Sequence, residues 1–141
     1  EILRCLVGSE MCIRDRMNTA DRSLAMIDYA LRRRFSFFEM NPGFLTDGFK
    51  NYMDTLSNER FNKIISGILE INEFICKDDS LGNGFCIGHS YFCNQKEFNL
   101  EWLENVIEYD IAPMLKEYWF DDVQKYESQI TLLRNILNDN R

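Results

Sequence analysis

The chain has 141 residues, which allows one modest domain, or a small domain plus a fragment of another. Of these residues 45% are hydrophobic and 13% aromatic, so a real core is possible and global disorder is excluded. Residues 1–34 carry seven basic and five acidic side chains, whereas residues 35–141 carry nine basic and eighteen acidic ones. Because an acidic surface repels the phosphate backbone, the second part is a poor candidate for binding nucleic acid.

The cysteine pattern argues against a zinc site. The five cysteines include no Cys-x-x-Cys pair, and the single histidine, His89, cannot complete a zinc site at these spacings. We therefore predict no metal ligands and reduced thiols in a cytoplasmic protein. No apolar run approaches the ~20 residues of a membrane helix, and charged residues interrupt the first segment where a signal peptide needs an apolar stretch. The sequence predicts no membrane partner.

Residues 1–16 have no helical or strand period. The run from Val7 to Arg16 resembles the peptide that arises when a sequencing adapter is translated by mistake. We therefore predict that this segment is an artefact and exclude it from the fold; the alternative is a genuine helix or strand of unusual composition.

The stretch from Met17 to Arg34 predicts a strand end, a turn and one short helix. Thr19 or Asp21 can cap that helix, and Leu24, Ile27 and Leu31 recur at helical spacing. Arg32, Arg33 and Arg34 complete its last turn, where cations complement the helix dipole. Successive helical positions differ by about 100°, so at most two of these guanidinium groups can reach one target.

An apolar strand is predicted over Phe35–Met40, and Asn41-Pro42-Gly43 ends it, which places a domain boundary at about residue 42. The pattern beyond it predicts a helical bundle. It predicts helices over 44–56 and 58–76, a loop over 78–84, and an extended piece over 85–92 that turns at Gly88. A further helix begins at Asn99, and Pro113 kinks or divides it. Asp121 or Asp122 caps a final helix, which runs through Leu137. The predicted fold is mainly α with a remnant of α/β structure.

Two motifs in the first part, Met17-Asn-Thr-Ala-Asp-Arg-Ser and Asp28-Tyr-Ala-Leu-Arg-Arg-Arg-Phe35, resemble the McrB-type branch of AAA+ nucleotide hydrolases. Two later motifs agree with it in order and spacing: Ile87-Gly-His-Ser-Tyr-Phe92 and the run from Tyr109 to Asp122. The resemblance covers residues 17 to about 137. It implies that 17–41 is the C-terminal end of an AAA+ α/β core and that 42–141 is a helical lid over the nucleotide.

The resemblance also implies roles for individual residues. Asn18 would be the sensor asparagine close to the γ-phosphate and the attacking water, with Asp21 in the same motif. Arg33 would be the finger offered to the neighbouring subunit's nucleotide, while Arg32 and Arg34 would make polar contacts nearby. The segment Gly88-His89-Ser90 would lie near the second sensor position.

The implied cofactor is GTP or ATP with magnesium. The implied partners are further copies in a ring, a hexamer by analogy, and the nuclease subunit of a modified-DNA restriction system; other parts of the assembly would contact DNA. The phosphate-cradling Gly-x-x-x-x-Gly-Lys-Ser/Thr motif does not occur in the 141 residues. We therefore expect no hydrolysis by this chain alone.

Other interpretations remain open. The arginine triplet can be a solvated helix end, and His89 can be a turn or helix-capping residue. The parent protein can be an AAA+ remodelling ATPase of the chaperone-like kind. The chain can also be a non-catalytic helical module whose basic edge docks an acidic partner.

Overall fold

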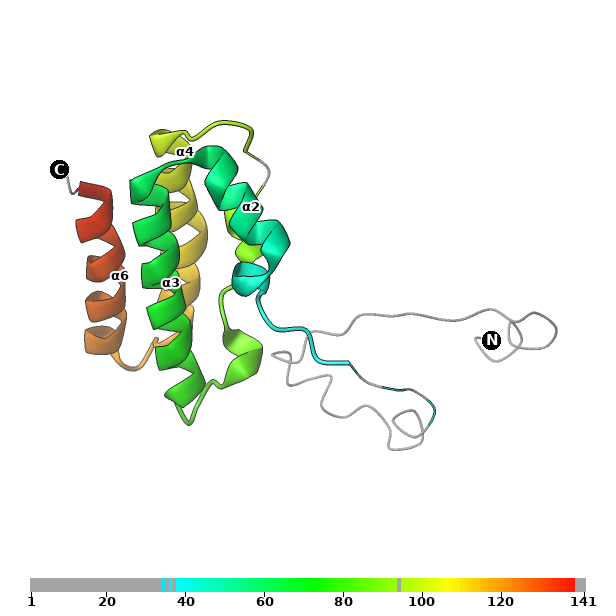
Figure 1. Cartoon of the computed structure of the whole chain (residues 1–141). Helices are drawn as coiled ribbons and strands as arrows, with labels where there is room; N and C mark the ends of the chain where they lie inside the picture. Colours follow the sequence, from blue (N-terminus) through cyan, green and yellow to red (C-terminus); the bar gives the residue numbers. More distant parts are fainter. Residues whose placement is uncertain (1–33, 35, 37, 94, 139–141) are drawn as a thin grey trace, which may run out of the picture. The chain divides into compact units, whose positions relative to one another are not determined.

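The computed structural model describes residues 34, 36, 38–93 and 95–138 (Figure 1). The chain divides into two compact units, Glu1–Phe37 and Phe38–Arg141. The regular elements of the described residues all lie in the second unit. In order they are η3 (Gly43–Leu45), α2 (Asp47–Leu56), α3 (Glu59–Lys77), η4 (Asn83–Phe85), η5 (His89–Phe92), α4 (Leu100–Asn105), η6 (Val106–Ile111), α5 (Ala112–Tyr118) and α6 (Val123–Asn138).

The strand predicted over Phe35–Met40 is not formed in the described part of that segment. Ser36 and Phe38–Met40 have no regular structure, and the side chains of Phe38 and Met40 are 88% and 80% exposed. A strand with two apolar faces needs neighbouring strands for its backbone groups and covering layers for its side chains. The described residues contain no strand that could supply either, so the α/β remnant is absent from them.

The first two predicted helices are confirmed as α2 and α3, each with its own cap. Thr46 Oγ1 accepts from Phe49 N at 3.4 Å, and Asn58 Oδ1 accepts from Phe61 N at 3.0 Å. The helix predicted from residue 44 therefore starts only at Asp47, because Thr46 is extended and separates η3 from α2. Ser57, in the left-handed region with φ 44°, makes the turn between α2 and α3.

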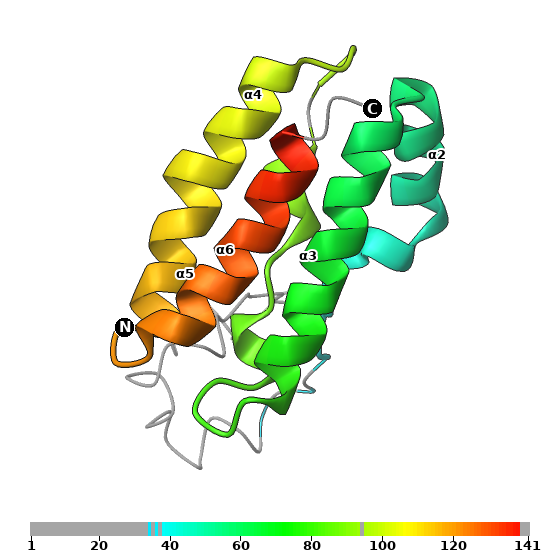
Figure 2. The ribbon, with the colours of Figure 1, turned by 90° about the vertical axis from the view of Figure 1, so that its left-hand side faces the viewer.

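The helix predicted from Asn99 continues as far as Tyr118, and its middle is π-helical. Asn99 caps α4, η6 is a π-helix, and α5 follows with Pro113 in its first turn. In Figure 2 the ribbon runs from α4 into α5 as one rod of helix. Proline has no N–H to donate, so it fits where a wide turn has already interrupted the regular hydrogen-bond pattern. Pro113 thus lies at the start of α5, as the predicted second helical segment requires, and the backbone stays helical through Ile111 and Ala112.

The final helix, α6, packs along α3 (Figures 1 and 2). Its predicted cap is confirmed at Asp122, whose Oδ1 accepts from Lys125 N at 3.1 Å. The two helices approach closely at Gly67, where an added Cβ would lie 3.0 Å from Leu132 Cδ2. Arg134 of α6 also forms two hydrogen bonds with Glu108 of η6, at 2.7 and 2.6 Å, and this contact lowers the pKa of Glu108.

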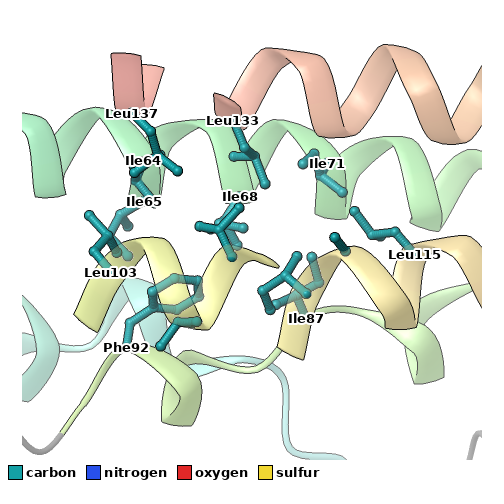
Figure 3. Packing of buried hydrophobic residues seen from close by; sticks show 14 of the residues in the cluster. Ile64, Ile65, Ile68, Ile71, Ile87, Phe92, Leu103, Leu115, Leu133 and Leu137 are labelled. Carbon is teal, nitrogen blue, oxygen red and sulfur yellow. The ribbon is translucent and has the colours of Figure 1, made fainter. Parts of the chain in front are cut away.

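The core lies between α3, α6, the rod of α4 to α5 and the segment from Ile87 to Phe92 (Figure 3). Six apolar side chains that recur at helical spacing form a stripe along α3, and all of them are buried: Phe61, Ile64, Ile65, Ile68, Ile71 and Ile75. Burying a side chain of this size contributes roughly 1.5–3 kcal/mol, so this single stripe outweighs any one polar contact in the domain.

Asp78 joins the end of α3 to the start of α6. Its Oδ2 accepts from Lys125 Nζ at 3.0 Å and from Trp119 Nε1 at 3.1 Å, and its Oδ1 accepts from Ser80 N at 2.9 Å. Hydrogen bonds from Ser80, followed by those from Lys125 and Trp119, hold the pKa of Asp78 well below its ordinary value.

We expect Asp78→Asn to lower the free energy of unfolding by about 1–2 kcal/mol near neutral pH, because these donors lose a charged acceptor. The depressed pKa means that the stability contributed by Asp78 is complete above the ordinary aspartate pKa, near 4, and is lost as the pH falls below it. The difference in Tm between the native chain and Asp78→Asn should therefore shrink from pH 6 to pH 3. The matched control is Asp79→Asn, at the exposed neighbouring position; an equal loss of stability in that variant would contradict the assignment.

Candidate functional site

The segment that leads into Gly88-His89-Ser90 is fixed to α3 by the side chain of Asn72. Asn72 Nδ2 donates to the carbonyl oxygen of Ile87 at 3.0 Å, and Asn72 Oδ1 accepts from Ile87 N at 2.6 Å. Asn72 is only 8% exposed and Ile87 only 1%. One amide thus satisfies both backbone groups of a buried residue, in the way that a neighbouring strand would. The backbone directly before Gly88 is therefore held in place by α3.

Asn72 was not among the residues that the sequence singled out, although the sequence carried a signal. It lies four positions after Ile68 and three before Ile75, within the apolar stripe of α3. A polar residue on a buried stripe must find hydrogen-bond partners, and a primary amide offers both a donor and an acceptor. The pattern could not reveal which backbone would supply them.

His89 contacts the start of the helical unit. Its Nδ1 accepts from Gly43 N at 3.0 Å, so this nitrogen is the acceptor of the ring and Nε2 is its donor. The rings of Phe44 and Phe49 meet it edge-on at 6.1 and 5.9 Å between centroids. Gly43 is the first residue of η3, and its N–H has no partner within that element. The imidazole therefore caps η3.

Glycine at position 43 makes this contact possible. A Cβ on Gly43 would lie 3.0 Å from His89 Cε1 and 3.1 Å from Nε2, so a side chain there would press on the ring. On the other side, Cys93 Sγ donates to the carbonyl oxygen of His89 at 3.3 Å. The hydroxyl-bearing Ser90 remains exposed beside the half-buried histidine.

The predicted site residues fall into two groups. Asn18, Asp21, Arg32 and Arg33 lie outside the described residues. Arg34 lies in a turn of the first compact unit with its side chain exposed, whereas Gly88, His89 and Ser90 belong to the second unit. The structure brings His89 against η3, while Ile87, directly before Gly88, is bound to α3; the one definite role that it shows for His89 is to cap η3.

Two further features concern only the described residues. Among them, no group of three or more His, Cys, Asp or Glu side chains is arranged to hold a metal ion. Likewise, none of their helices is both long and apolar enough to cross a membrane.

The sequence of the helical unit matches a known domain family. The family model of the McrB alpha-helical lid domain matches residues 63–127. Over these residues the helical unit belongs to the McrB-type lid family. The matched residues include most of α3, the Asn72 contact, Gly88–Ser90 and the whole rod from α4 to α5.

A curated relative extends the similarity beyond the lid. The chain is 47% identical over 118 residues to the type IV methyl-directed restriction enzyme EcoKMcrB subunit of Escherichia coli strain K12. The matched stretch covers 79% of this chain but 26% of that protein, so the chain spans about a quarter of the relative's length. A contiguous stretch that covers 79% of 141 residues must contain residues 32–34, wherever it begins. The arginine triplet therefore lies within the McrB-like region.

Proposed function

We propose that the chain is the lid and the adjoining end of the catalytic core of an AAA+ nucleoside triphosphatase that serves as a ring motor in restriction of modified DNA. The match of the helical unit to the McrB lid family carries this proposal. The name of the E. coli relative, a subunit of a methyl-directed restriction enzyme, supports the DNA-restriction setting over a chaperone-like one.

Within this proposal, the residues before the lid stabilise the negative charge that develops on the γ-phosphate during hydrolysis. Magnesium-bound GTP or ATP supplies the phosphoanhydride bond that is cleaved. Transfer of its terminal phosphoryl group to water spreads negative charge over the γ-oxygens, which a rigidly placed guanidinium stabilises. Arg33 is proposed to be that group, acting on the nucleotide of the next subunit, with Arg32 and Arg34 as its polar neighbours. Asn18 and Asp21 would orient the attacking water and the γ-phosphate.

The lid's own proposed contact with nucleotide is the Gly88–Ser90 segment. Because Nδ1 of His89 accepts from Gly43 N, Nε2 is the ring nitrogen left to donate, and the exposed Ser90 hydroxyl is a second donor. A phosphate or sugar oxygen can accept from such donors, and the Asn72 contact holds the backbone of Ile87, two residues before His89. The magnesium ligands are proposed to come from the phosphate-binding part of the parent protein.

The proposed assembly is a homo-oligomeric ring, a hexamer by analogy with AAA+ motors, together with a nuclease subunit. A finger that acts on a neighbour's nucleotide requires such a ring, because one protomer cannot complete its own site.

A chimera tests the proposal. The aligned region of the E. coli EcoKMcrB subunit is replaced by the matched region of this chain, and GTP and ATP hydrolysis are measured for the chimera and for the parent. We expect the chimera to hydrolyse the nucleotide that its parent hydrolyses, within about tenfold of the parental rate, because the matched region supplies an intact lid and arginine triplet. A folded, ring-forming chimera without turnover would contradict the proposal and favour a non-catalytic helical module.

A further inference from the structure

Two cysteine sulfurs meet where α3 ends and the segment before Gly88 passes it. Cys76 lies in the last turn of α3 and Cys86 directly after η4, and their Sγ atoms are 3.2 Å apart. Both are free thiols, with Cys76 exposed and Cys86 half-buried. Since the sulfurs of a disulfide are about 2.0 Å apart, the pair needs to approach by only about 1 Å to bond.

The backbone around this pair is already fixed. The residue after Cys86 is Ile87, whose N–H and carbonyl oxygen are both bound by Asn72 of α3. Cys86 Sγ itself lies 3.9 Å from the backbone oxygen of Asn72. The half-buried thiol is therefore held against the same helix that carries its partner. Bond formation requires side-chain adjustment rather than movement of a chain segment.

We propose that Cys76 and Cys86 are a redox modification site, which a peroxide converts into a reversible intramolecular disulfide that joins α3 to the segment leading into Gly88-His89-Ser90. The inference stands on the thiol geometry alone and does not depend on the proposed function.

The step balances with hydrogen peroxide as the oxidant. The Cys76 thiolate attacks the peroxide O–O bond, which gives a Cys76 sulfenic acid and releases the other oxygen as water after protonation. The Cys86 sulfur then attacks the Cys76 sulfur, forming the S–S bond, and the sulfenic hydroxyl leaves as water with the Cys86 proton. Two thiols lose two electrons in total, and one peroxide becomes two waters.

The two sulfurs have different roles in this order of events. Cys76 is the one that solvent reaches, so it meets the oxidant first. Burial, followed by the neighbouring Cys76 sulfur, raises the pKa of Cys86, which keeps it a thiol until its partner is oxidised. Cys93 is also half-buried, but its Sγ donates to the His89 carbonyl oxygen, so it offers a matched control on the same segment.

The test uses the full chain, oxidised with a small excess of hydrogen peroxide, alkylated and digested with trypsin without reduction. Cleavage at Lys77 separates the peptide Ile64–Lys77, with Cys76, from Asp78–Lys96, with Cys86 and Cys93. We expect these two peptides to be joined as the main product and to separate after dithiothreitol. The oxidised chain should also show a Tm about 5–15 °C higher than the reduced chain, as a disulfide closing a short loop produces.

Variants assign the bond. Cys93→Ser should keep the joined peptides, whereas Cys86→Ser should lose them and accumulate a Cys76 sulfenic acid that dimedone traps. Circular dichroism checks that each variant is folded. Linkage of Cys76 to Cys93, to Cys5 or to Cys12 would overturn the proposal, as would a Cys76 sulfinic acid beside an alkylatable Cys86.

Discussion

Arg33→Ala, placed in a hydrolysing chimera with the E. coli relative, is expected to reduce turnover by roughly 10³–10⁵-fold while leaving the affinity for nucleotide within about threefold. The rate falls because the γ-phosphoryl charge that develops in the transition state loses its guanidinium partner. Binding survives because most contacts to the ground-state nucleotide come from the phosphate cradle of the parent. Steady-state hydrolysis measured alongside equilibrium binding of a fluorescent nucleotide separates the two effects.

Arg34→Ala is the matched control for this prediction, since it removes the same charge at the next position. The finger should also act on a neighbour. Subunits with Arg33→Ala are therefore mixed with subunits that keep Arg33 but cannot bind nucleotide. Partial activity is expected from mixed rings, because the intact Arg33 of one subunit can act on the nucleotide bound by its Arg33→Ala neighbour. Unchanged turnover in Arg33→Ala, together with a severe loss in Arg34→Ala, would move the finger to Arg34.

Asn72→Ala is expected to lower the free energy of unfolding of the lid by about 2–5 kcal/mol, because it strands the N–H and the carbonyl group of a buried Ile87. This is a large share of the stability of a small domain. Urea denaturation followed by circular dichroism measures the loss. The position should also reject Asn72→Asp, since a carboxylate can accept from Ile87 N but cannot donate to Ile87 O.

The control is Asn62→Ala, an exposed asparagine on the same helix, which is expected to change stability by less than about 0.5 kcal/mol. Equal losses of stability at positions 62 and 72 would show that helix propensity, rather than the hydrogen bonds from Asn72 to Ile87, governs the result. Hydrogen exchange at Ile87 N–H supplies a second measurement, because loss of these hydrogen bonds should accelerate exchange there in Asn72→Ala alone.

Periodic burial explains which parts of the fold the sequence predicts. The α3 stripe and the α6 cap at Asp122 are local patterns, so their helices are found where apolar spacing and capping residues indicate. The short break at Thr46 is also local, because Thr46 bonds Gly43 O and caps α2, whereas the 3-10 turn at His89 makes a contact far along the chain. His89 meets Gly43, and no local rule connects positions 46 residues apart.

The candidate site divides in the same way. Family motifs in the sequence identify Asn18, Asp21 and the arginine triplet, and their roles stay predictions because all of these except Arg34 lie outside the described residues. The sequence also selected Gly88–Ser90, but it missed the residue that holds this segment. Asn72 becomes meaningful only when α3 and Ile87 are placed side by side, which is a tertiary fact.

The π-helical segment η6 reconciles the four-residue spacing of the buried side chains in the rod with the 3.6 residues per turn of an α-helix. Leu103, Ile107, Ile111 and Leu115 recur every four positions, and each is fully buried. In a regular α-helix a repeat of four advances about 40° beyond a full circle, so three such steps would carry the last side chain about 120° away from the first. The wider turns of η6 take up this excess and keep one edge facing inward. A deletion of one residue within Val106–Ile111 would therefore behave as a rotation of everything downstream.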